Sequence, residues 1–184
     1  MSISVQSKAL PQFIDPRRLS AHGKILNGHI DLNLCDRLQE AVVEISTPIS
    51  SNLSFYVEDQ SRKVVRVKSS VTVKIMCQRC LVAMPLCLEC DTILCIVWTE
   101  DEANTLPKHL DPWIVEEDKG DAIQLVEDEL LLALPFVAYH NEDKCNSLTS
   151  SSNTDADYLD NNIKLKRSPF AVLKGLKNNN FDDQ

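Results

Sequence analysis

Three stretches in the first half of the chain alternate apolar and polar residues. They cover residues 53–57, 64–75 and 86–98. A period of two with one apolar face is typical of an antiparallel strand that packs on one side only. Short connections at residues 59–62 and 77–85 separate the stretches. The pattern therefore predicts a three-stranded meander with one face turned toward a core.

The segment before this meander allows two interpretations. Residues 41–45 suit a fourth strand, whereas residues 31–44 suit a short helix. Periodicity does not decide between them, because the segment is short and its apolar positions fit both patterns.

The clearest helical pattern covers residues 121–134. Asp121 is a suitable N-cap, Gln124 stands three residues later as in a capping box, and Pro135 ends the helix. The apolar face consists of Ile123, Val126, Leu130 and Leu134. We expect that face to cover the sheet, while the acidic residues 127–129 lie on a solvated face. The predicted fold class is therefore α+β, with an antiparallel, meander-like or barrel-like sheet covered by one main amphipathic helix.

The end of the chain differs in composition from the rest. Residues 146–163 are dominated by Asn, Ser, Thr and Asp, which predicts a flexible linker. Residues 164–184 contain a short helical motif with Ser168 as N-cap and Pro169 in its first turn. A helix this short is marginal in water, so its apolar stripe is expected to dock on its own domain or on a partner. The prediction is an α+β domain over residues 1–145, followed by the linker and a docking helix.

Composition limits the class of protein. The chain has 184 residues with 43 % hydrophobic residues, which is enough for one core. No apolar run approaches the ~18 residues of a membrane helix, and the first fifteen residues do not resemble a signal peptide. We therefore expect a cytoplasmic protein. Seven cysteines, an odd number, argue against a closed disulfide framework and favour reduced thiols, some of them on a metal.

The net charge of −8 is unevenly placed. Between Glu100 and Glu129, eleven carboxylates stand against two lysines. An acidic surface repels RNA phosphate and attracts basic proteins, although the same pattern also fits a solvated surface without a partner. The residues expected to contact a partner protein are Glu116, Glu117, Asp118, Glu127, Asp128, Phe170 and Leu173.

Basic residues gather on the predicted hairpin and on the turn that follows it. If the chain binds RNA directly, the expected phosphate contacts are Arg62, Lys63, Arg66, Lys68 and Arg79. Aromatic residues make up only 5 % of the chain, so base stacking is a weak prospect.

The candidate chemistry centres on Cys77 and Cys80. Two cysteines separated by two residues suit one tetrahedral metal or a redox pair. Cys87 and Cys90 are poor additional ligands, because residues three apart in a strand point to opposite faces. A thioredoxin-like site is disfavoured as well, since that motif opens a helix and here strands flank it on both sides.

His140 and Cys145 are the better additional ligands. They follow the predicted helix directly, where the chain can return to the cysteine turn. The sequence thus favours one structural Zn²⁺ on Cys77, Cys80, His140 and Cys145. Two alternatives stay open: a redox-sensing metal site, and a tight turn with two free thiols and an exposed histidine.

Catalytic signatures are missing from the sequence. The four glycines do not form a phosphate-binding loop, there is no Gly-x-Ser-x-Gly elbow, and the four histidines show no nucleophile pattern. The prediction is therefore a protein that is not an enzyme.

The order of these features resembles the YceD-like family, the large ribosomal RNA subunit accumulation proteins. The matching stretches are Cys77–Leu81, Leu125–Pro135, the His140–Cys145 spacing, Ser168–Leu173 and the amino-terminal Leu10-Pro11 with Asp15-Pro16. Ser168 stands where the family's terminal motif usually has Asn, and Cys87 and Cys90 lie outside the family pattern. The resemblance implies a role in the synthesis, processing or stability of 23S ribosomal RNA, and it supplies no catalytic residue.

Three functional hypotheses follow. The chain acts in large-subunit assembly by contacting a ribosomal protein or the pre-ribosomal large subunit through its acidic stretch and terminal stripe. Alternatively, it binds ribosomal RNA directly through the basic residues. The third hypothesis is a zinc-dependent or thiol-based redox-sensing module.

Overall fold

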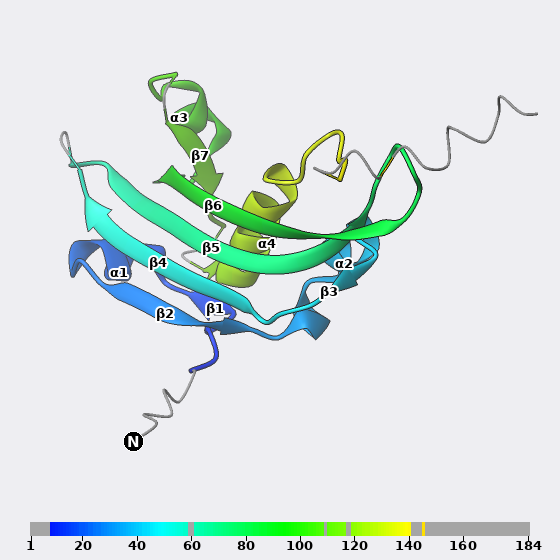
Figure 1. Ribbon diagram of the computed structural model, residues 1–184. Helices are drawn as coiled ribbons and strands as arrows, with labels where there is room; N and C mark the ends of the chain where they lie inside the picture. Colours follow the sequence, from blue (N-terminus) through cyan, green and yellow to red (C-terminus); the bar gives the residue numbers. More distant parts are fainter. Residues whose placement is uncertain (1–7, 59–60, 109, 117–118, 141–144, 146–184) are drawn as a thin grey trace, which may run out of the picture. The chain divides into compact units, whose positions relative to one another are not determined.

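The computed structural model describes residues 8–58, 61–108, 110–116, 119–140 and 145 (Figure 1). All of them belong to the compact unit Met1–Asn146. The predicted linker at 146–163 and the predicted docking helix at 164–184 lie outside the described residues.

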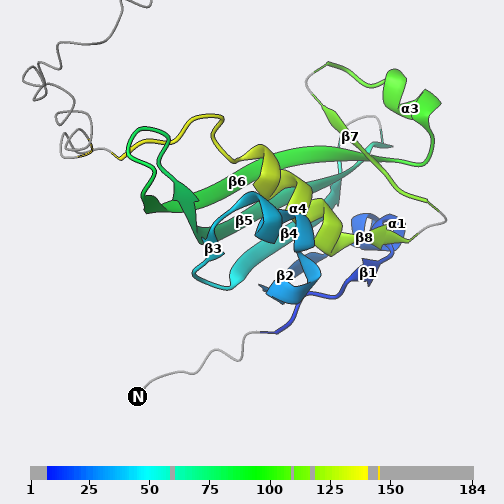
Figure 2. The ribbon, with the colours of Figure 1, turned by 90° about the vertical axis from the view of Figure 1, so that its right-hand side faces the viewer.

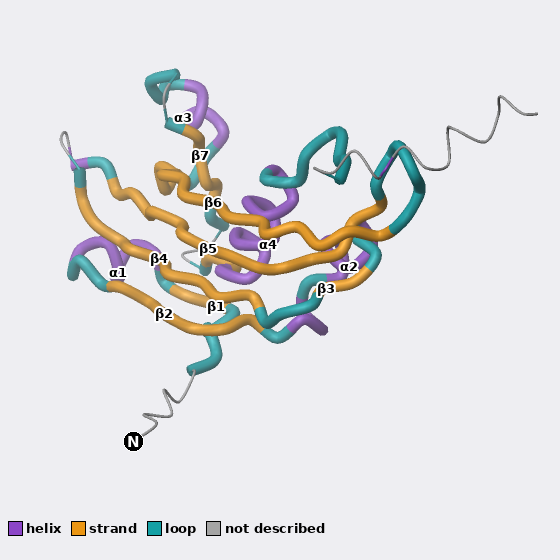
Figure 3. The backbone as a smooth tube through the Cα atoms, viewed as in Figure 1, coloured by secondary structure: helices purple, strands orange, loops and turns teal. Residues whose placement is uncertain are grey.

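The main sheet is a meander extended at both edges (Figure 3). Its strand order is β2 (Ile25–Ile30), β4 (Ile49–Val57), β5 (Lys63–Met76), β6 (Ala83–Val97) and β7 (Asp111–Ile114), and β3 (Glu44–Ile45) also pairs with β5. Every pair is antiparallel except β6 with β7. The predicted meander is confirmed as β4–β5–β6. The described strands form an open sheet with β2 and β7 at its edges, so the barrel-like version of the prediction is wrong.

Strand β5 shows why these residues form a sheet. Its odd positions from Val65 to Ile75 are buried, whereas its even positions from Arg66 to Lys74 are half-buried or exposed. Val67 lies between Leu53 of β4 and Thr92 of β6. The alternation in the sequence therefore corresponds to one apolar face that packs on the core and one polar face that does not.

Helix α4 (Ala122–Leu132) covers the apolar face and packs on β5 and β6 (Figure 2). Helix α2 (Asp36–Ala41) packs beside α4, and α1 (Pro16–Ala21) packs on β4 and β5. The predicted core residues Ile123, Val126 and Leu130 are buried. The fold is thus α+β with its core between the sheet and α4, as predicted.

The start of α4 matches its predicted cap. Asp121 Oδ1 accepts hydrogen bonds from the backbone N–H groups of Ile123 and Gln124, each at 2.9 Å. The helix ends at Leu132, and Pro135 follows within three residues. Since proline lacks an N–H, the chain leaves the helical path there.

The expected solvated face of α4 is wrong for two carboxylates, because Glu127 and Glu129 are buried. Glu127 accepts hydrogen bonds from Arg37 and from the backbone of Leu38, and Glu129 accepts one from Thr92 Oγ1 at 2.7 Å. The physical reason is that α4 packs on α2 as well as on the sheet, so more of its circumference is buried than one apolar stripe indicates. Buried carboxylates are tolerated there because each is hydrogen-bonded.

The remaining elements are short. The ambiguous segment contains both predicted forms, since the 3₁₀ turn η1 (Leu32–Leu34) and α2 precede the strand β3. Strand β1 (Phe13–Ile14) pairs with β8 (Gly120–Asp121), and α3 (Glu100–Asn104) lies between β6 and β7. None of the helices in the described ranges combines the length and the apolar character needed to cross a membrane.

Candidate metal centre

The turn between β5 and β6 holds two of the candidate ligands. Cys77 follows the last residue of β5, and its backbone N–H donates to the carbonyl of Val82 at 3.0 Å. Leu81 donates back to the carbonyl of Cys77 at 2.9 Å and adopts a left-handed backbone with a φ of 58°. This compact turn directs Cys77 inward, where it is buried, and leaves Cys80 half-buried.

The other two ligands come from the chain beyond α4. After Pro135 the chain runs back along the cysteine turn, and Gln78 fixes it there with two hydrogen bonds. Its backbone N–H donates to the carbonyl of Ala138 at 2.9 Å, and its Nε2 donates to the carbonyl of Phe136 at 3.2 Å. These contacts bring His140 to the turn, and Cys145 is buried there as well.

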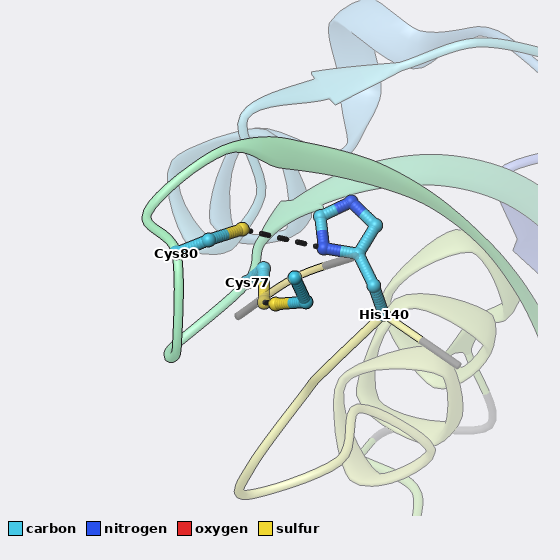
Figure 4. Close-up of side chains that lie close together, drawn as sticks. Cys77, Cys80 and His140 are labelled. Carbon is cyan, nitrogen blue, oxygen red and sulfur yellow. Dashed lines mark hydrogen bonds between the residues drawn. The ribbon is translucent and has the colours of Figure 1, made fainter. Parts of the chain in front are cut away.

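The four ligand atoms form one compact cluster. Cys77 Sγ and Cys145 Sγ are 3.4 Å apart, and Cys80 Sγ lies 3.4 Å from His140 Nδ1 (Figure 4). All four atoms lie within 4.8 Å of one another. A tetrahedral zinc with Zn–S bonds of about 2.3 Å places its ligand atoms roughly 3.5–4 Å apart. The Cys₃His set therefore fits a structural zinc ion in both donor type and spacing.

The electrostatics of the cluster also suit a cation. Burial opposes ionisation of Cys77, but the backbone N–H groups of Cys80, Arg79 and His140 stabilise its thiolate and lower its pKa well below the usual value. Burial and the neighbouring sulfurs of Cys77 and Cys80 raise the pKa of Cys145. One thiolate thus forms easily, and further negative charge is unfavourable without a positive ion. A bound metal would supply that charge.

The remaining cysteines do not join the cluster. Cys87 is exposed on β6, whereas Cys90 is half-buried against the core, so the opposite-face argument from the sequence holds. Cys95 is buried in a second, smaller core with Val64. Cys35 is buried too, and burial together with the Glu127 carboxylate raises its pKa to about 12. Cys35, Cys90 and Cys95 therefore act as apolar side chains.

The structure spreads the predicted RNA-contact residues along the sheet. Lys63 begins β5 with Arg62 just before it, whereas Arg79 lies in the cysteine turn beyond the other end of the strand. The fourteen residues between Lys63 and Met76 span up to about 45 Å. Arg66 and Lys68 lie between these ends and both bind Asp91, at 2.6 Å and 3.2 Å. The five residues therefore do not form one compact basic patch.

The residues predicted to bind a partner protein differ in exposure, and only some of them belong to the described part of the chain. Glu116 is exposed, and Asp128 is partly exposed and paired with Arg37 at 2.7 Å. Glu127 is buried and its carboxylate is occupied by Arg37 and Leu38, so it is not available at the surface. Glu117, Asp118, Phe170 and Leu173 lie outside the described residues.

The apolar residues around the cluster were not among the predicted site residues. Leu81 and Val82 in the turn, and Phe136, Val137 and Tyr139 after the helix, are large apolar residues that stay exposed. The available signal was their position: they flank predicted metal ligands and stand outside every predicted strand and helix. Arg37 was missed as well, because nothing in its local sequence shows that it meets Glu127, ninety positions away.

Comparison with known proteins places the chain among related sequences. A family model described as "Large ribosomal RNA subunit accumulation protein YceD" matches residues 65–177. A protein of Haemophilus influenzae with the same description is 34 % identical over 174 residues, which cover 94 % of this chain and 99 % of the relative. No solved structure matches the chain.

Proposed function

Because the chain belongs to the YceD family of large ribosomal RNA subunit accumulation proteins, we propose that it is a non-enzymatic factor for the accumulation of 23S ribosomal RNA. The observation that carries this proposal is the similarity to the H. influenzae relative over nearly the whole length of both chains. The factor acts in the cytoplasm, during the synthesis, processing or stabilisation of that RNA.

The structure suggests how such a factor works without catalysis. The Cys₃His cluster joins the turn of the sheet to the chain beyond α4, and a Zn²⁺ ion held there would fix these two segments as one surface. Zinc in this role is structural, because all four positions of a tetrahedral ion are occupied by protein ligands and none remains for a substrate.

Contact with a protein of the pre-ribosomal large subunit is the favoured mode of action. The chain carries a net charge of −8, whereas the basic residues on β5 are partly neutralised by Asp91. An acidic protein attracts basic partners and repels bare phosphate. The proposed arrangement is a binding domain at residues 1–145, a linker at 146–163 and a docking motif at 164–184, with Glu116, Asp128, Phe170 and Leu173 contributing to the contact.

A test in cells measures the ratio of large-subunit to small-subunit ribosomal RNA after the gene is deleted. We expect the ratio to fall, the wild-type chain to restore it, and Cys80→Ser to restore it poorly because the variant lacks one metal ligand. Cys87→Ser is the matched control, since Cys87 is exposed outside the cluster. An unchanged ratio after deletion would contradict the proposal.

Thiol-based sensing is the second candidate function, and one distance favours it. The sulfurs of Cys77 and Cys145 are 3.4 Å apart, close enough to join after a small movement. Hydrogen peroxide would take two electrons from the two thiolates, which join as one disulfide, and with two protons from solvent it would be reduced to two water molecules. A metal bound at the site would lose two ligands and be released. If peroxide treatment neither releases zinc nor forms this disulfide, the sensing function is excluded while the structural role of zinc stands.

A further inference from the structure

Five exposed apolar residues lie on the two segments that meet at the metal cluster, and we call them the knuckle patch: Leu81, Val82, Phe136, Val137 and Tyr139. Leu81 is 73 % exposed and Phe136 is fully exposed. The cluster and the two hydrogen bonds from Gln78 hold both segments of the patch together. Large apolar side chains that stay exposed close to one another on a surface mark interaction sites.

Leu81 gives the strongest sign that the patch has a use. Its φ of 58° is a left-handed conformation that glycine adopts freely and that leucine rarely adopts. The side chain gains little from the fold, because most of it is in water. A leucine that is unfavourable for the backbone and is not packed in the core is best explained by a contact outside this domain.

The chemistry of the patch selects the kind of partner. The net charge of −8 repels RNA phosphate, and three of the five side chains are aliphatic, so only two aromatic rings could stack on bases; both points disfavour RNA. Arg79 lies over the Tyr139 ring at 5.0 Å, within the patch. Two copies of this chain would each carry a net charge of −8 and repel one another, which disfavours a second copy as the partner.

We propose that the knuckle patch docks a basic protein, which presents an apolar cluster beside a hydrogen-bond acceptor for Arg79. The argument for a basic partner is charge complementarity with a chain of net charge −8. This proposal rests on the proposed function and deepens it, because it names the surface by which the chain would contact a basic protein of the large subunit. The aliphatic residues supply the buried centre of the contact, and Arg79 sets its orientation.

The test uses full-length protein and two probes from purified large ribosomal subunits of the same organism: the salt-extracted proteins and, separately, the extracted RNA. The variants are Leu81→Gly and Phe136→Ala. Their matched controls are Ile25→Ala and Phe13→Ala, because Ile25 and Phe13 are also exposed but lie on β2 and β1. Affinity is measured by titration, the bound protein is identified by mass, and thermal midpoint and zinc content are recorded for each variant.

We expect wild type to bind a basic protein of the subunit, and each patch variant to lower the affinity by about tenfold or more. Both controls should stay within about twofold of wild type, as residues outside a contact do. Leu81→Gly should keep its zinc and have an unchanged or higher thermal midpoint, because glycine relieves the left-handed backbone. Loss of binding without loss of stability separates docking from a structural role.

Three results would overturn the proposal: patch variants that bind the protein as wild type does, patch variants that lose RNA binding instead, or a wild-type dimer that the variants abolish. If wild type itself binds no protein of the subunit, the protein-contact version of the proposed function has failed. Equal binding by wild type and variants contradicts the knuckle patch alone.

Discussion

Two of the contacts that connect α4 and the chain beyond it to the rest of the domain, which we call ties, differ in what they require. The Cys₃His cluster joins the segment after α4 to the β5–β6 turn, and its four ligand atoms lie within 4.8 Å of one another with no cation from the protein among them. The Glu127 tie joins α4 to α2 through hydrogen bonds of 2.9 to 3.1 Å from Arg37 and Leu38. The first tie depends on an ion from solution, whereas the second is complete within the chain.

The two ties stabilise different parts of the molecule. Glu127 compensates for a poor helix cap, since Cys35 at the N-cap of α2 makes no side-chain hydrogen bond and the Leu38 N–H would otherwise lack an acceptor. The Glu127 tie therefore belongs to the core of the fold. The metal cluster lies at the end of the sheet and holds the exposed surface, so its loss should affect that surface first.

Removal of zinc is the largest predicted effect. Protein purified without chelator should contain one zinc per chain, and a site saturated at about a thousand times its Kd stabilises the fold by ~4 kcal/mol. A strong chelator should remove that stabilisation and lower the thermal midpoint, while α4 and the sheet remain folded because their core does not include the cluster. Metal analysis with circular dichroism on heating measures both.

Cys80→Ser should reproduce the effect of the chelator, and Cys87→Ser should behave as wild type. If the purified protein contains no zinc and the chelator does not change its unfolding, the cluster is only a group of neighbouring thiols and a histidine. The cluster would then not need an ion from solution, and this difference from the Glu127 tie would be lost.

Breaking the Glu127 tie is the second largest effect. Glu127→Ala leaves the Leu38 N–H and the Arg37 guanidinium without their acceptor, which should lower the free energy of unfolding by about 3 kcal/mol. Zinc content should not change, because the tie and the cluster lie at different places. Urea denaturation and metal analysis on the same sample test both statements.

The matched control is Asp128→Asn. Asp128 shares Arg37 but its side chain is 44 % exposed, so its loss should cost less than about 0.5 kcal/mol. If the two variants lost the same free energy of unfolding, burial would not explain why Glu127 stabilises the fold more than Asp128.

The two ties also differ in how far the sequence predicts them. The sequence predicts one set of ligands, Cys77, Cys80, His140 and Cys145, because ligand spacing and a helix that ends at a proline are local features. The Glu127 tie depends on where α2 packs, and a glutamate between apolar helix residues looks solvated when α2 cannot be placed. Local patterns predict the meander and α4 for the same reason, but not the parallel strand β7.

The cap of α4 tests whether both ties depend on one helix. Asp121 accepts two backbone hydrogen bonds at the start of α4, and Asp121→Ala should cost about 1 kcal/mol. Because α4 carries Glu127 and the metal ligands His140 and Cys145 follow it in the chain, Asp121→Ala should lower the free energy of unfolding by similar amounts in chelated and in zinc-loaded protein. Denaturation in both states measures this, with the exposed Gln124→Ala as control. A cost no larger than that of the control would contradict the role of the cap.

The smallest predicted effect concerns the exposed ion pairs of Asp91 on the polar face of the sheet. They are a useful comparison, because the carboxylate of Glu127 is buried and that of Asp91 is not. Asp91 binds Arg66 and Lys68, and hydrogen bonds from Arg66 with the added charge of Lys68 lower its pKa from 3.8 to about 2. A lowered pKa means that the folded state favours the carboxylate. The stabilisation is therefore present above pH 4 and is lost as the pH falls from about 4 toward 2.

Asp91→Asn should consequently lower the thermal midpoint at pH 7 by no more than about 2 °C, because solvent screens this exposed pair. The difference in thermal midpoint between Asp91→Asn and wild type should disappear as the pH falls toward 2. The neighbouring variant Glu89→Gln should have the thermal midpoint of wild type at neutral pH. Thermal unfolding at a series of pH values gives both curves. Two results would contradict this: Asp91→Asn lowers the thermal midpoint as much as Glu127→Ala does, or its effect persists at pH 2. Burial would then not be the reason why one carboxylate stabilises this fold strongly and another weakly.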